Sequence, residues 1–137
     1  NAVYDRHVDH GKGASLAYDA SFLSGLSKIR TSDDDGRDQE AWRPEVVYHY
    51  IQSYSAKPDF VVDISDHWET KMKAILAFRS QFHNPDSNEP ETYISDPAFM
   101  KMLESRAQEL GHSIGVRYGE GFTTRRTPGV KSLFDLR

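Results

Sequence analysis

The sequence contains no cysteine, and this absence narrows the chemistry open to the chain. Without cysteine there is no disulfide framework and no thiolate metal site. The absence also agrees with a reducing compartment. No apolar run approaches the ~20 residues that span a bilayer, and no secretory leader opens the sequence. We therefore expect a cytoplasmic protein with no membrane partner.

Basic charge and apolar residues are also scarce. The 137 residues carry a formal net charge of −4, and the isoelectric point is about 5.8. Because no basic excess is available to bind phosphates, we expect no nucleic-acid partner. Hydrophobic residues make up only 37% of the chain, so the core should be modest. This composition is typical of a small domain, or of a fragment that shares the core of a missing part.

Groups able to bind a metal or move a proton are concentrated in the stretch Tyr-Asp-Arg-His-Val-Asp-His-Gly, residues 4–11. His7, Asp9 and His10 all have side chains that zinc accepts as ligands. Because neighbouring side chains in a loop diverge, we expect one of them to bind the metal and the others to orient it or act on the substrate. Asp9 can accept a ring N–H, and His7 can stabilise negative charge or transfer a proton. The structural alternative is that Asp9 caps the helix that follows.

Hydrophobic periodicity predicts a helix over residues 11–29, with Leu16, Ala20 and Leu23 on a stripe that faces a sheet. Alternation rich in valine and tyrosine predicts a strand over 45–51, and an apolar run predicts a second over 60–64. Further helices are expected from residue 65 or 66 to about 82 and from 96 to 110, with an extended segment over 114–122. Residues 83–95 have loop composition. Two strands form a narrow sheet, which indicates that more strands are missing.

His83 and Glu120 are two further candidates for a functional role. His83, at the edge of the predicted loop, is the best of the remaining histidines as a reserve candidate, although such histidines are usually structural. Glu120 lies between two glycines, a pattern that fits either a close approach by a substrate or subunit, or a β-bulge.

The motif Arg-His-Val-Asp-His, residues 6–10, resembles the Arg-His-Pro-Asp-His motif of the PIG-L/LmbE-like zinc deacetylases. The resemblance continues in order along the chain and is strongest to the branch that deacetylates N-acetylglucosaminyl malate in bacillithiol biosynthesis. Its further segments are Phe-Leu-Ser-Gly-Leu (22–26), Ala-Trp-Arg-Pro (41–44), Lys-Pro-Asp-Phe (57–60), Ser-Gln-Phe (80–82), Tyr-Gly-Glu-Gly-Phe (118–122) and Gly-Val-Lys-Ser (129–132).

Two departures from the family stand out. Val8 occupies the position where the family usually has proline, which makes that stretch less rigid. The family's other metal motif, Ala-His-Pro-Asp-Asp, is absent from these 137 residues. We therefore expect residues 1–137 to be the C-terminal part of a single deacetylase domain. The resemblance implies an α/β fold, in which this chain supplies part of a Rossmann-like, doubly wound, mostly parallel sheet flanked by helices.

The resemblance also implies roles for the motif residues. His10 would be a ligand of Zn²⁺, and His7, oriented by Asp9, would stabilise the oxyanion or protonate the leaving amine. Arg6 would hold an oxygen or carboxylate of the substrate. The implied activity is hydrolysis of the N-acetyl group of an N-acetylated sugar conjugate, with N-acetylglucosaminyl malate as the expected substrate, in a homo-oligomer. The alternative is a catalytically silent module that keeps the fold and only binds sugar or contacts a subunit.

Overall fold

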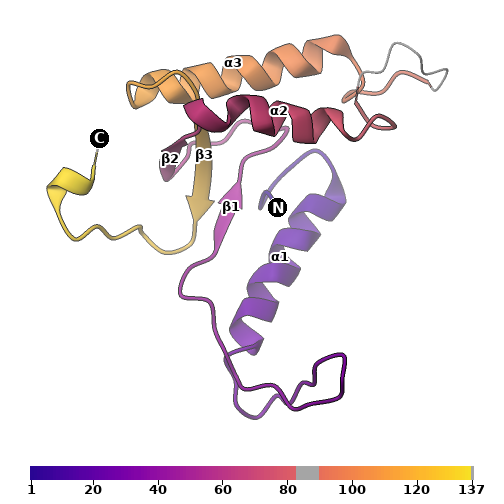
Figure 1. Ribbon diagram of the computed structural model, residues 1–137, viewed down its shortest axis with the longest axis vertical. Helices are drawn as coiled ribbons and strands as arrows, with labels where there is room; N and C mark the ends of the chain where they lie inside the picture. Colours follow the sequence, from indigo (N-terminus) through magenta and orange to yellow (C-terminus); the bar gives the residue numbers. More distant parts are fainter. Residues whose placement is uncertain (83–89, 137) are drawn as a thin grey trace. The chain divides into compact units, whose positions relative to one another are not determined.

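The computed structural model describes residues 1–82 and 90–136. Its α/β character agrees with the predicted class. The elements follow the order α1 (Val8–Leu23), β1 (Tyr48–Tyr50), β2 (Phe60–Asp63), η1 (Ser65–His67), α2 (Trp68–Leu76), α3 (Pro97–Ser113), β3 (Gly119–Thr124) and η2 (Leu133–Asp135). Figure 1 labels the α-helices and the strands. His83 and much of the predicted loop around it lie outside the described residues.

The chain divides into two compact units. The first unit comprises Asn1–Phe60 and Phe122–Gly129, and the second comprises Val61–Gly121 and Val130–Arg137. Within the part of the chain that the structure describes, no helix combines the length and the apolar character needed to cross a membrane.

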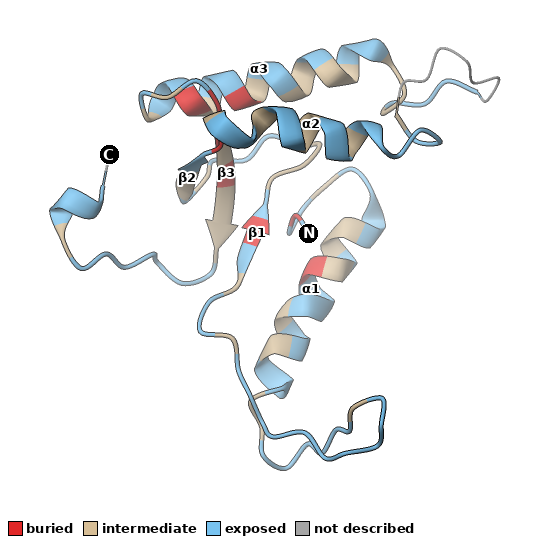
Figure 2. Cartoon of the chain, viewed as in Figure 1, coloured by how far each residue is buried: buried red, intermediate tan, exposed pale blue. Residues whose placement is uncertain are grey.

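Helix α1 of the first unit begins earlier and ends earlier than its predicted range, at Val8 and Leu23. The predicted apolar stripe is wrong, because Leu16, Ala20 and Leu23 are all exposed, Leu16 by 70%. The buried residue of α1 is instead Ala14. Figure 2 shows the rest of this helix as intermediate or exposed. Small residues allow the chain to approach closely there: a Cβ added to Gly11 would lie 3.1 Å from the carbonyl oxygen of Val3.

The three strands form one sheet in the order β1-β3-β2. Strand β1 pairs antiparallel with β3, and His49 lies opposite Thr123. The hydrogen bonds of the two residues that flank β2 indicate that β2 also pairs antiparallel with β3. The amide of Asp59 donates to Phe122 O (2.8 Å) and that of Ile64 to Tyr118 O (3.0 Å), so the partner's number falls as the chain advances along β2. For these strands the predicted parallel arrangement is wrong. Periodicity identifies strands but does not determine the direction in which they pair.

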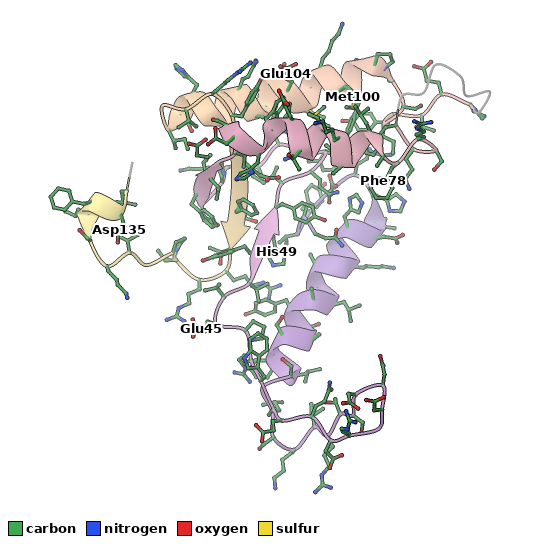
Figure 3. All side chains as sticks on the ribbon, in the orientation of Figure 1. Glu45, His49, Phe78, Met100, Glu104 and Asp135 are labelled. Carbon is green, nitrogen blue, oxygen red and sulfur yellow. The ribbon has the colours of Figure 1, made fainter. Side chains whose placement is uncertain are left out.

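The second unit has a small core formed by Ile64, Ala107 and Tyr118. Trp68 of α2 stacks on the ring of Tyr118 at a centroid distance of 4.5 Å. The hydroxyl of Tyr118 donates to Glu104 of α3, which is labelled in Figure 3, at 3.1 Å. The side chain of Tyr118, the residue before β3, therefore contacts both α2 and α3.

Gly119, one of the two glycines beside Glu120, has a structural role. A Cβ added to Gly119 would lie 2.8 Å from the backbone nitrogen of Gly111, so β3 approaches the backbone of α3 closely at this point. The carboxylate of Glu120 accepts from the ammonium of Lys71 on α2 at 2.6 Å. The close approach that Gly119 permits is thus made to α3 of the same chain, and Glu120 pairs with α2.

Candidate metal and catalytic site

The structure brings His7, Asp9 and His10 together at the N-terminus of α1. His7 is the N-cap residue, and its Nδ1 accepts from the backbone N–H of Asp9 at 3.3 Å. The structural alternative, in which Asp9 caps the helix, is therefore wrong, since Asp9 lies in the first turn. A carboxylate there still benefits from the helix dipole. Val8 is the first helical residue, a position at which the family's proline would also fit.

His7 and Asp9 are both open to solvent. Their side chains are 51% and 76% exposed, and Oδ2 of Asp9 lies 3.6 Å from Nδ1 of His7. This distance is too long for a hydrogen bond but places a negative charge beside the ring. The His7 ring also lies near the ring of His10, at a centroid distance of 5.5 Å. His7 can therefore reach the same small region of solvent as His10.

His10 is held by the carboxylate of Asp5, for which the sequence predicted no role. Its Nδ1 lies 2.5 Å from Oδ2 of Asp5, and the Asp5 side chain is fully buried whereas that of His10 is 31% exposed. The other carboxylate oxygen, Oδ1, accepts from the amides of Ser53 (2.9 Å) and Tyr54 (3.1 Å), just beyond β1. The only signal in the sequence was an aspartate five residues before a histidine, which does not predict this contact.

The pKa of the Asp5 carboxyl is set by two opposing effects. Burial raises this pKa, whereas hydrogen bonds to His10 and to the amides of Arg6, Tyr54 and Ser53 lower it, and the net result is a lowered pKa. Asp5 is therefore ionised at neutral pH.

Arg6 lies directly before the N-cap and is exposed, as a residue that contacts a substrate must be. The backbone amide of Arg6 donates a hydrogen bond to the carboxylate of Asp5. This bond helps to hold the backbone of Arg6 in place beside His7. The four residues predicted from the motif thus share one end of α1.

The donor set of this site fits one part of a zinc centre. A histidine that binds zinc usually donates its other ring N–H to a carboxylate, as the Asp5–His10 contact allows. A catalytic zinc site needs three protein ligands. Among residues 1–82 and 90–136, no three histidine, cysteine or carboxylate side chains are grouped closely enough to hold a metal ion. The described residues therefore fit the role of one ligand and its support.

A separate cavity of about 700 Å³ lies in the first unit, and none of the residues predicted from the motif lines it. Two arginines on its wall are stacked on aromatic rings, Arg43 over Phe22 at 4.4 Å and Arg125 over Tyr18 at 3.8 Å. These guanidinium groups help to hold the cavity wall together.

Comparison with known proteins identifies deacetylases as relatives, although no protein-family model matches the chain. The chain is 31% identical over 128 residues to diacetylchitobiose deacetylase of Thermococcus kodakarensis. Its structure resembles that of N,N'-diacetylchitobiose deacetylase from Pyrococcus horikoshii, solved with its inhibitor MPG, with a TM-score of 0.65 and 34% identity. It also resembles the conserved protein TT1542 from Thermus thermophilus, with a TM-score of 0.72 and 25% identity.

These matches cover nearly all of this chain but only part of each relative. The aligned region is 93% of this chain and 42% of the Thermococcus protein. It is 88% of this chain and 41% of the Pyrococcus chain, and 93% of this chain and 50% of the Thermus chain. The chain thus spans half or less of the length of the relatives that it matches. It is homologous to part of diacetylchitobiose deacetylase and has the α/β fold of the matching region.

Proposed function

We propose that this chain forms part of the active site of a metal-dependent hydrolase that removes the N-acetyl group from an N-acetylated sugar. The observation that carries the proposal is the placement of His10, with Nδ1 against a buried carboxylate, at the start of a helix in a chain homologous to a deacetylase. Residues 1–137 would then be the C-terminal part of one deacetylase domain. The comparisons do not favour the catalytically silent alternative.

In this proposal each motif residue has a separate task. His10 binds the metal through Nε2, because Nδ1 faces Asp5. When bound, zinc supplies a Lewis acid that polarises the amide carbonyl and activates water. His7, with the carboxylate of Asp9 beside it, stabilises the developing oxyanion or gives a proton to the leaving amine. Arg6 pairs with an oxygen or carboxylate of the substrate.

The substrate that we propose is N-acetylglucosaminyl malate, with glucosaminyl malate and acetate as products. The support is the resemblance of the segments at 22–26, 41–44 and 118–122 to the bacillithiol-biosynthesis branch. The relatives named above carry the name of another N-acetylated sugar, diacetylchitobiose. A cytoplasmic location and a homo-oligomer remain predictions.

The test is acetate release by the native protein, assayed in parallel with N-acetylglucosaminyl malate and diacetylchitobiose, together with its zinc content. We expect stoichiometric zinc and faster release from the malate conjugate. Faster release from diacetylchitobiose would contradict the substrate but keep the reaction class. Neither zinc nor acetate release would contradict the reaction class and favour the silent module.

A further inference from the structure

The surroundings of Asp5 show that both of its carboxylate oxygens are committed. Oδ1 accepts from the backbone amides of Ser53 and Tyr54, and Oδ2 faces Nδ1 of His10 at 2.5 Å. The side chain is fully buried, so water does not compete for either oxygen. These contacts join residues 53–54, just after β1, to the first turn of α1 within the same unit.

This geometry determines which ring nitrogen of His10 carries the proton. An ionised carboxylate can only accept hydrogen bonds, so the nitrogen that faces it must donate. Nδ1 of neutral His10 therefore carries the proton, and the lone pair is on Nε2. The histidine side chain keeps partial exposure (31%), which leaves a route by which a ligand can reach the ring.

We propose that Asp5 is a positioning residue for His10, which fixes both the ring orientation and the tautomer that presents Nε2 to a divalent cation. This inference rests on the proposed function, in which His10 binds the metal. It adds to that function a residue, Asp5, that lies outside the Arg-His-Val-Asp-His motif. It also separates the two carboxylates of this stretch, since Asp5 supports His10 whereas Asp9 lies beside His7.

The substitution Asp5→Asn tests this assignment because it reverses the tautomer with little change in shape. The amides of Ser53 and Tyr54 are donors, so the new side chain must place its carbonyl oxygen at the Oδ1 position. Its NH₂ group then faces His10 and donates to Nδ1. The proton of His10 moves to Nε2, which can no longer bind a metal in that form.

Asp33→Asn is a matched control. Oδ1 of Asp33 also accepts from two backbone amides, those of Asp35 (3.0 Å) and Arg37 (2.9 Å). These contacts of Asp33 involve no histidine, so the same chemical change should leave His10 unaffected.

The measurements are zinc affinity, by competition with a chelator, and the ¹⁵N shifts of the His10 ring in the metal-free protein, both made on the complete native polypeptide. We expect Asp5→Asn to weaken zinc binding by about 10–100-fold and to move the proton from Nδ1 to Nε2. The control should match the wild type in both measurements.

Three results would overturn the inference. The first is zinc affinity in Asp5→Asn equal to that of the wild type. The second is a wild-type ring that is protonated on Nε2, a result that remains informative if the variant does not fold. The third is a wild type that binds no zinc, a result that would also contradict the proposed function. The first two results contradict only the role of Asp5.

Discussion

His7 and His10 lie within one helical turn, yet their surroundings differ. His10 is braced by a buried carboxylate, whereas His7 is exposed and uses Nδ1 to cap α1. We predict that His10→Ala abolishes zinc retention. We predict that His7→Ala retains zinc but loses turnover by about 10²–10⁴-fold, the usual contribution of a general acid. Metal analysis and acetate release check these outcomes.

The loss of the helix cap must be separated from the loss of proton transfer in this experiment. Replacing a cap residue by alanine costs about 0.5–2 kcal/mol of stability. His7→Asn is the control, because asparagine keeps an oxygen that can accept from Asp9 but cannot transfer a proton. The role of His7 would be wrong if His7→Asn kept full turnover.

At the residue scale, the sequence predicted which side chains gather but not what each of them contacts. Spacing and family resemblance placed His7, Asp9 and His10 at one site, and they do lie at one helix end. Asp5 was not recognised, because its contacts with residues 53–54 join segments that are distant in the sequence. Local spacing carries no information about such contacts.

At the scale of elements, the contact between α3 and β3 depends on two glycines. A Cβ added to Gly111 would lie 2.8 Å from both Tyr118 N and Val116 O, which are backbone atoms that cannot easily move aside. We predict that Gly111→Ala lowers the free energy of unfolding by about 1–3 kcal/mol, as overpacking usually does. Urea denaturation measures this change.

Gly129→Ala is the control for this prediction. A Cβ added at Gly129 meets no atom within 4 Å, and Gly129 does not have a positive φ. We expect the stability of Gly129→Ala to match or slightly exceed that of the wild type. Equal stability of the two variants would show that the close approach at Gly111 does not constrain packing.

The sequence predicted the elements better than their pairing. Strand β2 and helix α3 lie within two or three residues of their predicted ranges, because apolar runs and the Asp-Pro cap are local signals. The antiparallel order β1-β3-β2 was not predicted. The apolar stripe of α1 was predicted to face a sheet, but it is exposed in the structure. Periodicity shows that a helix has an apolar face but not what covers that face.

For the whole molecule, the notable feature is the number of large apolar side chains at the surface compared with the small core. Among the described residues, no large side chain is fully buried, whereas Leu16, Trp42 and Phe134 are exposed by 70%, 69% and 98%. Exposed apolar surface of this kind binds hydrophobic dyes and promotes association. We predict that a polypeptide of residues 1–137, expressed by itself, binds anilinonaphthalene sulfonate strongly.

The helix α1 offers a matched pair for this prediction. Leu16→Gln removes a large exposed side chain, whereas Ala17→Gln makes the same polar substitution at a neighbouring exposed position with little apolar surface to remove. Dye fluorescence should fall in Leu16→Gln and stay unchanged in Ala17→Gln. Equal fluorescence in both variants would mean that this face of α1 does not bind the dye.

The central claim is that His10 binds a catalytic metal through Nε2 while Asp5 holds Nδ1. Anomalous diffraction at the zinc edge, from crystals of the native protein, tests this claim most directly. We expect a zinc peak about 2.0–2.1 Å from Nε2 of His10, with Nδ1 still against Asp5. A zinc peak bound by other residues, or a His10 ring with no metal beside it in a protein that contains zinc, would contradict the account.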